Sequence, residues 1–167
     1  DVDDTAVVIM ALNEVKLPDE KAKDAAIARG MQWVASMQCK PGGWAAFDID
    51  NDQDWLNWIP YGDLKAMIDP NTADVTARVL ESIGRGGVTT GAHSVERAIQ
   101  YLLKEQEAEG CWFGRWGVNY VYGTSGVLVA LALMAPKRCA SEITRGAAWI
   151  VSCQNADGGW GETCKSY

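Results

Sequence analysis

Three aspartates stand within the first four residues of the sequence, in the segment DVDDTA that covers residues 1–6. Crowded carboxylates do not all ionise easily, because each negative charge opposes the next. One of them can then keep its proton and act as an acid, while its neighbours hold it by hydrogen bonds in a site that excludes water. The segment therefore predicts an acid site formed by Asp1, Asp3 and Asp4.

Two other interpretations of this segment stay open. Acidic residues also cap helices, where free backbone N–H groups and the helix dipole favour a negative charge, and this would explain Asp4 before Thr5. The letters DVDDT also match the DxDxT pattern of haloacid dehalogenase-type phosphatases, in which an aspartate is the nucleophile and Mg²⁺ is bound. That fold alternates strands with helices, whereas the rest of this chain is patterned as helical pairs, so the phosphatase is disfavoured.

Aromatic residues are unusually frequent, with eight tryptophans and five tyrosines. Trp116, Tyr120 and Tyr122 lie close together before Thr124, and aromatic faces stabilise cations. An acid at one end of a cavity walled by rings would suit the formation of a carbocation from an alkene and its protection from water. An ordinary aromatic core would explain any single ring equally well.

Metal and disulfide chemistry are disfavoured. The cysteines are Cys39, Cys111, Cys139, Cys153 and Cys164. They form no CxxC pair and are odd in number, which indicates reduced thiols in a cytosolic setting, and we interpret the single histidine, His93, as a cap or surface residue. Alternating aspartates at positions 48, 50, 52 and 54 suggest a calcium loop, but Trp55 and Tyr61 stand where a loop starting at Asp50 needs glycine and glutamate. We expect no metal and a solvated acidic loop.

Composition limits the classes of partner. Of the residues, 48% are hydrophobic and 22% charged, which suits one folded segment over residues 1–167. The net charge of -7 and the lack of a basic run disfavour nucleic acid. No signal peptide is visible, and the longest apolar run, residues 126–136, is far short of the ~20 that a bilayer span needs. Because the sequence opens inside a motif, we expect both ends to be cuts in a longer chain.

The elements that must position these residues are organised by a repeat. QCKPGGW, QEAEGCW and QNADGGW cover residues 38–44, 106–112 and 154–160, and we name these segments the tryptophan turns. An aromatic residue lies five positions before each glutamine and an arginine nine before it, so the repeat includes the preceding helix. We interpret the turns as structural, with the amide bonding backbone and the indole packing beside it, while carbohydrate binding by the tryptophans is the alternative.

Two sets of helices alternate along the chain. Apolar residues recur at three- and four-residue steps over residues 25–37, 94–104 and 142–152, which predicts amphipathic outer helices. A second set begins at Thr5, Thr76 and Thr124 and is apolar on most sides, which indicates burial. The alternation predicts an all-α fold of helical hairpins that curve into part of an α/α barrel. The long connection over residues 45–71 is predicted to be a functional insertion at one rim.

Four motifs together resemble those of the squalene-hopene cyclases, over essentially the whole chain: DVDDTA at 1–6, DVTA at 74–77, WFGRWGVNYVYGT at 112–124, and the tryptophan turns. DxDD alone also marks class II diterpene cyclases, which remain an alternative, and oxidosqualene cyclases carry a single acidic residue in a DCTAE setting. The resemblance implies an isomerase of hopanoid biosynthesis that protonates the terminal double bond of squalene. It would close five rings through carbocations to hopene or hopanol without a cofactor.

The resemblance also implies roles for individual residues. Asp3 corresponds to the proton donor, Asp1 and Asp4 to its partners, and Asp74 to a supporting carboxylate. Tyr122 would lie close to the donor and help to reload its proton. The residues expected to contact the substrate and stabilise the cation are Trp116, Phe47, Tyr120 and Tyr61.

Two positions depart from the family pattern. Arg78 stands where the best-known members have a histidine that bonds into the acid cluster. Arginine cannot deliver a proton, but it lies four residues after Asp74 on the same helix face and can hold a carboxylate as a permanent cation. Phe47 replaces a usual tyrosine, which keeps the ring face and loses the hydroxyl. The reaction type is therefore better determined than the product.

The resemblance further implies squalene as a lipid partner, a homodimer, and a peripheral, monotopic position on the cytoplasmic side of the bacterial membrane. A noncatalytic α/α-repeat binding module with exposed tryptophans is the competing function from another class. A protein prenyltransferase β-subunit is disfavoured, because its zinc site needs a histidine among Asp and Cys ligands and His93 has no such arrangement.

The repeat gives a geometric prediction. Asp3, Asp74 and Tyr122 each lie two residues before the threonine of an inner helix. Equivalent positions in a barrel point alike, so these side chains should meet at the same end of the central space, with Arg78 one helical turn below Asp74. Capping alone would not gather them, since each aspartate would then serve its own helix.

Overall fold

All the regular structure in the described part of the chain is helical. The computed structural model describes residues 1–59, 67–86 and 91–166. The elements are α1 (Val2–Glu14), α2 (Glu20–Ser36), η1 (Asp54–Trp58), α3 (Ala73–Gly86), α4 (Ala92–Lys104), α5 (Asn119–Met134), α6 (Ala140–Ser152) and η2 (Cys164–Ser166). Within these ranges the only β-type pairing is two isolated bridges. The all-α prediction is confirmed.

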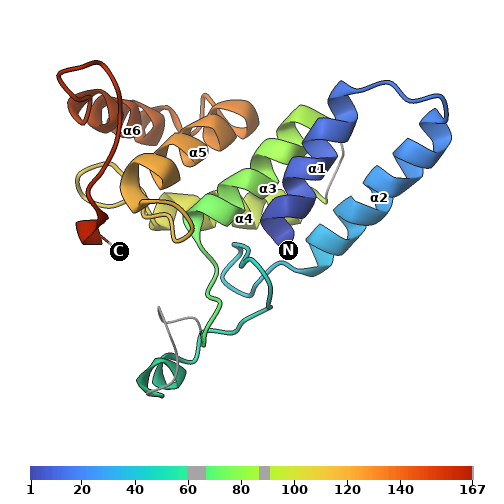
Figure 1. The fold of residues 1–167 in the computed structure, drawn as a ribbon, viewed down its shortest axis with the longest axis horizontal. Helices are drawn as coiled ribbons and strands as arrows, with labels where there is room; N and C mark the ends of the chain where they lie inside the picture. Colours follow the sequence, from blue (N-terminus) through green and yellow to red (C-terminus); the bar gives the residue numbers. More distant parts are fainter. Residues whose placement is uncertain (60–66, 87–90, 167) are drawn as a thin grey trace.

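The helices form three hairpins that stand side by side (Figure 1). α3 packs against both α1 and α5, and each of these inner helices also packs against the outer helix that follows it, α2, α4 or α6. The outer helices correspond to the segments 25–37, 94–104 and 142–152 predicted from periodicity. The hairpin repeat is thus confirmed, while closure into a barrel stays a prediction.

The predicted starts of the inner helices were wrong by three to five residues. Thr5, Thr76 and Thr124 lie inside the helices and do not open them. At the first helix the cap is Asp1, whose Oδ1 accepts a hydrogen bond from the Asp4 backbone N–H at 3.2 Å, so Asp4 is not the cap either. The observed first residues are Val2, Ala73 and Asn119.

Among the inner helices in the described ranges, burial on most sides holds for α3 only. α3 lies between two inner helices, and nine of its residues are buried. α1 and α5 each contact one inner helix, α3, and they expose apolar side chains such as Val8 and Leu133. Among the described helices, none combines the length and apolar character needed to cross a bilayer.

The first tryptophan turn links its own hairpin to the next one. Gln38 Nε2 donates to the carbonyls of Gly42, at 2.7 Å, and of Ser94 at the start of α4, at 2.9 Å. The indole of Trp44 donates to the Val34 carbonyl at 2.7 Å. The second turn repeats every one of these bonds through Gln106, Gly110, Glu142, Trp112 and Leu102. The structural interpretation of the turns is confirmed.

An arginine of the following outer helix completes each link. Arg97 Nη2 donates to the carbonyls of Cys39 and Lys40, both at 2.8 Å. Gly42 adopts φ +107°, and a Cβ at this position would lie 2.6 Å from the Arg97 carbonyl oxygen. Only glycine fits both the left-handed backbone and this close approach. In the second turn Arg145 Nη2 donates to the side-chain Oε1 of Gln106 instead.

The long connection after the first turn extends beyond the hairpins on the side where α1 begins (Figure 1). It is fixed at its base by antiparallel bridges between Trp44 and Thr72 and between Asn51 and Asp69. A hydrogen bond of 2.8 Å from the Val2 backbone N–H to the Ala46 carbonyl ties it to the first turn of α1. This places the base of the connection next to the aspartate-rich start of the chain, while its position at the rim of a barrel stays a prediction.

Candidate functional site

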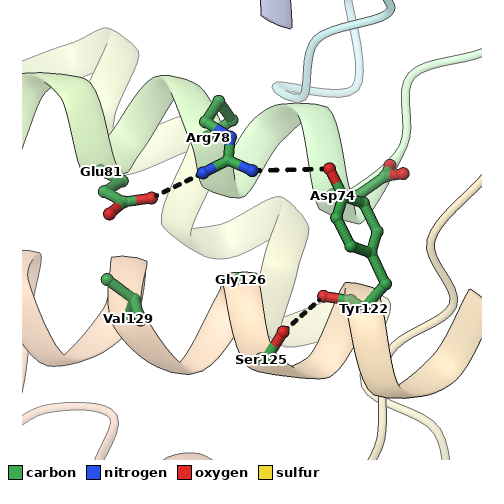
Figure 2. A pocket seen from close by; sticks show the side chains of 7 residues that line it. All are labelled: Asp74, Arg78, Glu81, Tyr122, Ser125, Gly126 and Val129. Carbon is green, nitrogen blue, oxygen red and sulfur yellow. Dashed lines mark hydrogen bonds and ion pairs between the residues drawn. The ribbon is translucent and has the colours of Figure 1, made fainter. Parts of the chain in front are cut away.

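Arg78 of α3 gathers side chains that come from three helices. Its Nε donates to Asp3 Oδ1 of α1 at 3.2 Å, and its Nη2 makes a long hydrogen bond of 3.5 Å to the Tyr122 hydroxyl of α5. Its Nη1 donates to Glu81 Oε2, one turn further along α3, at 3.2 Å. Figure 2 shows the bonds to Glu81 and Tyr122. We name Asp3, Asp74, Arg78, Glu81 and Tyr122 the Arg78 cluster.

The cluster opens into a pocket between α3 and α5 (Figure 2). The pocket is lined by Asp74, Arg78, Glu81, Tyr122, Ser125, Gly126 and Val129. The polar residues lie on α3 and at the start of α5, and the α5 side adds small and apolar residues. Asp74 and Tyr122 therefore line one pocket, and Asp3 is joined to it through Arg78, which agrees with the gathering of these residues that the repeat predicted.

Asp74 holds the loop that carries one of the predicted cation-binding rings. Its carboxylate is buried, and its Oδ2 accepts the Trp116 backbone N–H at 2.9 Å. Its Oδ1 accepts the N–H of Val75 at 3.0 Å. Both oxygens thus bond backbone groups, so Asp74 supports the site by fixing the position of Trp116.

Phe47 and Trp116 form an aromatic pair beside the cluster. Their ring centroids are 5.7 Å apart and the planes meet at 87°, an edge-to-face contact. The guanidinium of Arg115 lies 5.7 Å from the Trp116 ring centroid. Both rings are exposed in the described structure, at 54% for Phe47 and 49% for Trp116. The described residues therefore cover only part of each of these two side chains.

Asp69 fixes the backbone around Phe47, and sequence reasoning missed it. This buried carboxylate accepts the backbone N–H groups of Ala46, Phe47 and Asp48. Three donors on one carboxylate make a rigid, charge-assisted anchor. Asp69 lies in the long connection with no spacing to any motif, so nothing in the sequence singled it out.

Threonines two positions after the site residues tie them to the turns. Thr76 Oγ1 accepts the Trp44 backbone N–H, and Thr124 Oγ1 accepts that of Trp112, both at 2.9 Å. Both threonines are fully buried. Each turn thereby fixes the position, along its axis, of the inner helix that carries Asp74 or Tyr122. The recurring spacing to threonine predicts a helix start, whereas in the structure it marks this contact.

Other predicted site residues lie elsewhere. Asp1 and Asp4 are exposed and bond each other in the α1 cap. The Tyr120 ring contacts Phe113, with centroids 5.5 Å apart, and Trp149 of α6, so the structure does not bring it to the Arg78 cluster. Tyr61 lies outside the described residues.

The charges of the cluster are partly shielded from water. The Glu81 side chain is 12% exposed, that of Arg78 30% and that of Asp3 35%. Burial alone would lower the pKa of Arg78, but the hydrogen bond with Tyr122 and the negative charges of Asp3 and Glu81 outweigh it and raise that pKa. Arg78 is therefore a permanent cation beside the acid.

Residues of the types that can ligate a metal gather at a different place. Glu107, Glu109 and Cys111 of the second tryptophan turn have ligand atoms within 4.8 Å of one another. Exposed acidic groups often lie this close without an ion, and this group shares no residue with the Arg78 cluster. All five cysteines are free thiols, and His93 is exposed on α4, as the sequence predicted.

Comparisons with known proteins cover the chain from end to end. Residues 1–167 match the family model of the squalene-hopene cyclase C-terminal domain. The chain is 56% identical over 185 residues to dammaradiene synthase of Dryopteris crassirhizoma. It is 47% identical to squalene–hopene cyclases of Zymomonas mobilis, over 169 residues, and of Alicyclobacillus acidocaldarius, over 167. Each comparison covers 100% of this chain and 26–27% of the relative, so the chain spans about a quarter of their length.

Proposed function

The chain belongs to the squalene-hopene cyclase family, and on that premise we propose that the protein is a class II triterpene cyclase acting on squalene. The observation that carries the proposal is the bond from Arg78 Nε to Asp3 Oδ1, which joins the acid of the DVDDTA segment to the inner helices around the pocket. An acid that served only its own helix would have no such bond.

Asp3 starts the reaction in this proposal. Oδ1 accepts a hydrogen bond from an arginine, which can never take a proton, so the acidic proton is carried on Oδ2. The π electrons of the terminal double bond of squalene take that proton, and the O–H bond electrons stay on the carboxylate. Arg78 then stabilises the anion that is left, and a cation forms on the substrate.

The aromatic pair protects the cation. The faces of Trp116 and Phe47 offer negative electrostatic potential next to the acid, which suits a ring cation formed early in the cascade. The reaction ends when a carbon-bound proton is lost to a base or when water adds to the last cation. Because Tyr122 bonds Arg78 and arginine cannot relay a proton, reloading of Asp3 from Tyr122 requires a bridging water.

Two product classes follow from the relatives. Hopene or hopanol is the product that the resemblance to bacterial squalene–hopene cyclases favours. A dammaradiene is the second candidate, because dammaradiene synthase of D. crassirhizoma shares 56% identity, more than either bacterial enzyme. In this proposal either product would begin with protonation by Asp3, and the two would differ in the later steps of the cascade.

Incubation of the complete protein with squalene tests the proposal. Mass spectrometry of the extract should show a cyclic isomer of squalene, or that isomer plus one water. The chromatographic retention time and the mass-spectrometric fragmentation pattern distinguish hopene, hopanol and dammaradiene. If squalene is recovered unchanged by a folded protein, the cyclase is refuted and a noncatalytic repeat module takes its place.

We extend the proposal to the setting of the enzyme. Squalene is an apolar lipid, so a peripheral, monotopic position on the cytoplasmic side of the bacterial membrane would give access to it. A homodimer, as the family resemblance implies, is proposed for the complete protein. Vesicle flotation and light scattering of the complete protein test these two points separately.

A further inference from the structure

Glu81 is a charged residue of the site that the sequence motifs did not indicate. Its Oε2 accepts from Arg78 Nη1 at 3.2 Å, and its Oε1 accepts from Arg85 Nε at 2.8 Å. Its side chain is 12% exposed, against 48% for Arg85. Each of its oxygens is thus held by a different arginine, in a place where a carboxylate is largely removed from water.

The three nitrogens of Arg78 have three different partners. The guanidinium is planar and its N–H groups point in fixed directions, so fixing one of them sets the other two. Asp3 and Tyr122 come from other helices, whereas Glu81 follows on α3 itself, within one turn of Arg78. Its distance from the Arg78 backbone is therefore set by the helix and not by the packing of α1 or α5.

We propose that Glu81 is a positioning residue, which orients the Arg78 guanidinium so that Nε faces Asp3 and Nη2 faces Tyr122. Arginine has several rotatable bonds, and without this anchor its head group could turn toward Asp74 or toward solvent. Asp3 would then lose the bond that sets which of its oxygens carries the proton. This inference rests on the proposed cyclase function.

The positioning role of Glu81 depends on the presence of arginine at position 78. A histidine has two ring nitrogens and cannot serve three partners at once. In an Arg78→His variant, Glu81 therefore has no guanidinium to orient. The effect of changing Glu81 should then depend on which residue stands at position 78.

The test uses steady-state kinetics of the complete protein with squalene. Glu81→Gln should lower kcat by about 10- to 100-fold and leave KM nearly unchanged, because a misdirected Arg78 impairs the proton transfer and not the binding of substrate. Arg85→Gln is the matched control. It removes the other partner of Glu81 and should keep kcat within about twofold, since the Arg78–Glu81 bond stays.

A double-mutant cycle separates positioning from general helix stability. In the Arg78→His background, Glu81→Gln should change kcat by less than about threefold. Equal losses in both backgrounds, equal losses for Glu81→Gln and Arg85→Gln, or wild-type kcat in Glu81→Gln would each overturn the proposal. Circular dichroism melting checks each fold. If Glu81→Gln does not fold, Glu81→Asp, which retracts the carboxylate by one methylene, takes its place in the same comparison.

Failure of the two proposals can be told apart. If the wild-type protein makes no cyclic product, the cyclase function itself falls. If the wild type cyclises squalene and the Glu81→Gln variant does so equally fast, only the positioning role falls.

Discussion

The side chain of Asp3 has two carboxylate oxygens, and Oδ1 is already engaged with Arg78. This leaves Oδ2 for the chemistry that we propose. The neighbouring acids have other tasks, since Asp1 caps α1 through the Asp4 backbone and Asp74 fixes the backbone at Trp116. The aspartates thus differ in their hydrogen-bond partners, although they are the same residue type in the sequence.

Replacement of Asp3 tests the assignment of the donor. Asp3→Asn keeps the size and an acceptor for Arg78 but has no acidic proton, so turnover should fall by ~10² to 10⁴-fold in the complete protein. Melting temperature should stay close to that of wild type. Asp24→Asn, an exposed change on α2, is the control. Near-normal turnover in Asp3→Asn would refute the donor assignment.

Replacement of Trp116 tests the role of its ring. Trp116→Ala removes the π face that meets Phe47, whereas Trp116→Phe keeps a smaller one. We expect the alanine variant to lose roughly tenfold more turnover than the phenylalanine variant, which corresponds to ~1.4 kcal/mol of cation stabilisation. Product profiles should shift toward incompletely cyclised compounds. Equal losses in the two variants would indicate packing.

At the scale of single residues, the site residues that could be predicted from the sequence are those that share a position in the repeat. Asp3, Asp74 and Tyr122 share one position in the repeat unit. In the structure Asp74 and Tyr122 line one pocket with Arg78, and Asp3 is joined to that pocket by its bond with Arg78. Asp69 acts on backbone N–H groups of a loop, and such contacts leave no periodic trace in a sequence. Tyr120 shows the opposite error, because nearness in sequence to Tyr122 did not put it on the same face of α5.

At the scale of elements, the tryptophan turns set the spacing between hairpins. The turn glutamine reaches the following outer helix, the turn indole bonds the preceding one, and a threonine of the inner helix receives the tryptophan N–H. Periodicity predicted the helices but not where they begin. Asn119 is the first residue of α5, and its side chain donates to the Gly114 carbonyl at 2.6 Å, a contact with the preceding loop that periodicity does not show.

Two turn glycines form a matched pair for stability measurements. Gly42 and Gly158 both have positive φ, at +107° and +90°. A Cβ on Gly42 would meet the Arg97 carbonyl at 2.6 Å, whereas one on Gly158 would meet no atom within 4 Å among the described residues. Gly158→Ala should cost about 1 kcal/mol of unfolding free energy from backbone strain, and Gly42→Ala about 2 to 4 kcal/mol from strain plus the clash.

Urea unfolding of the two variants, followed by circular dichroism, gives the comparison. The difference between them isolates the contact of the turn with the next outer helix. Equal losses would show that the backbone conformation alone limits position 42 and that the turn does not press against Arg97.

Across the whole molecule, the sequence predicted the class of fold and the order of hairpins better than the degree of burial. The sequence predicts that each apolar inner helix is buried on most sides, yet among the described helices this holds for α3 alone. Burial depends on how many neighbours a helix has and not only on its own composition. The buried thiols were predictable as reduced cysteines, but not as groups that resist ionisation.

Stability of the molecule should therefore fall in mildly alkaline solution. Burial raises the pKa of Cys111 to about 11, while an unfolded thiol ionises near pH ~8.5. Between these values the unfolded chain has lost the proton and the folded one keeps it, so each rise in pH favours unfolding. Burial raises the pKa of Cys39, Cys139 and Tyr101 in the same direction.

Thermal melts from pH 8 to 10.5 under reducing conditions measure this decline. Cys111→Ser should make the decline shallower, because serine does not ionise in this range. Cys164→Ser, at an exposed position, should leave the slope as it is in wild type. A Cys111→Ser slope equal to that of wild type would contradict the assignment.

The partners of Gln38 lie 56 to 59 residues later in the chain, on α4. During synthesis the ribosome adds about 5–20 residues each second, so the partners of the first turn are synthesised roughly 3 to 12 s after it. Gln106 waits in turn for α6, 36 residues on. In the nascent protein each tryptophan turn can therefore form these bonds only after the next hairpin has been synthesised. The most recently synthesised turn lacks these bonds and is the part that a chaperone would contact.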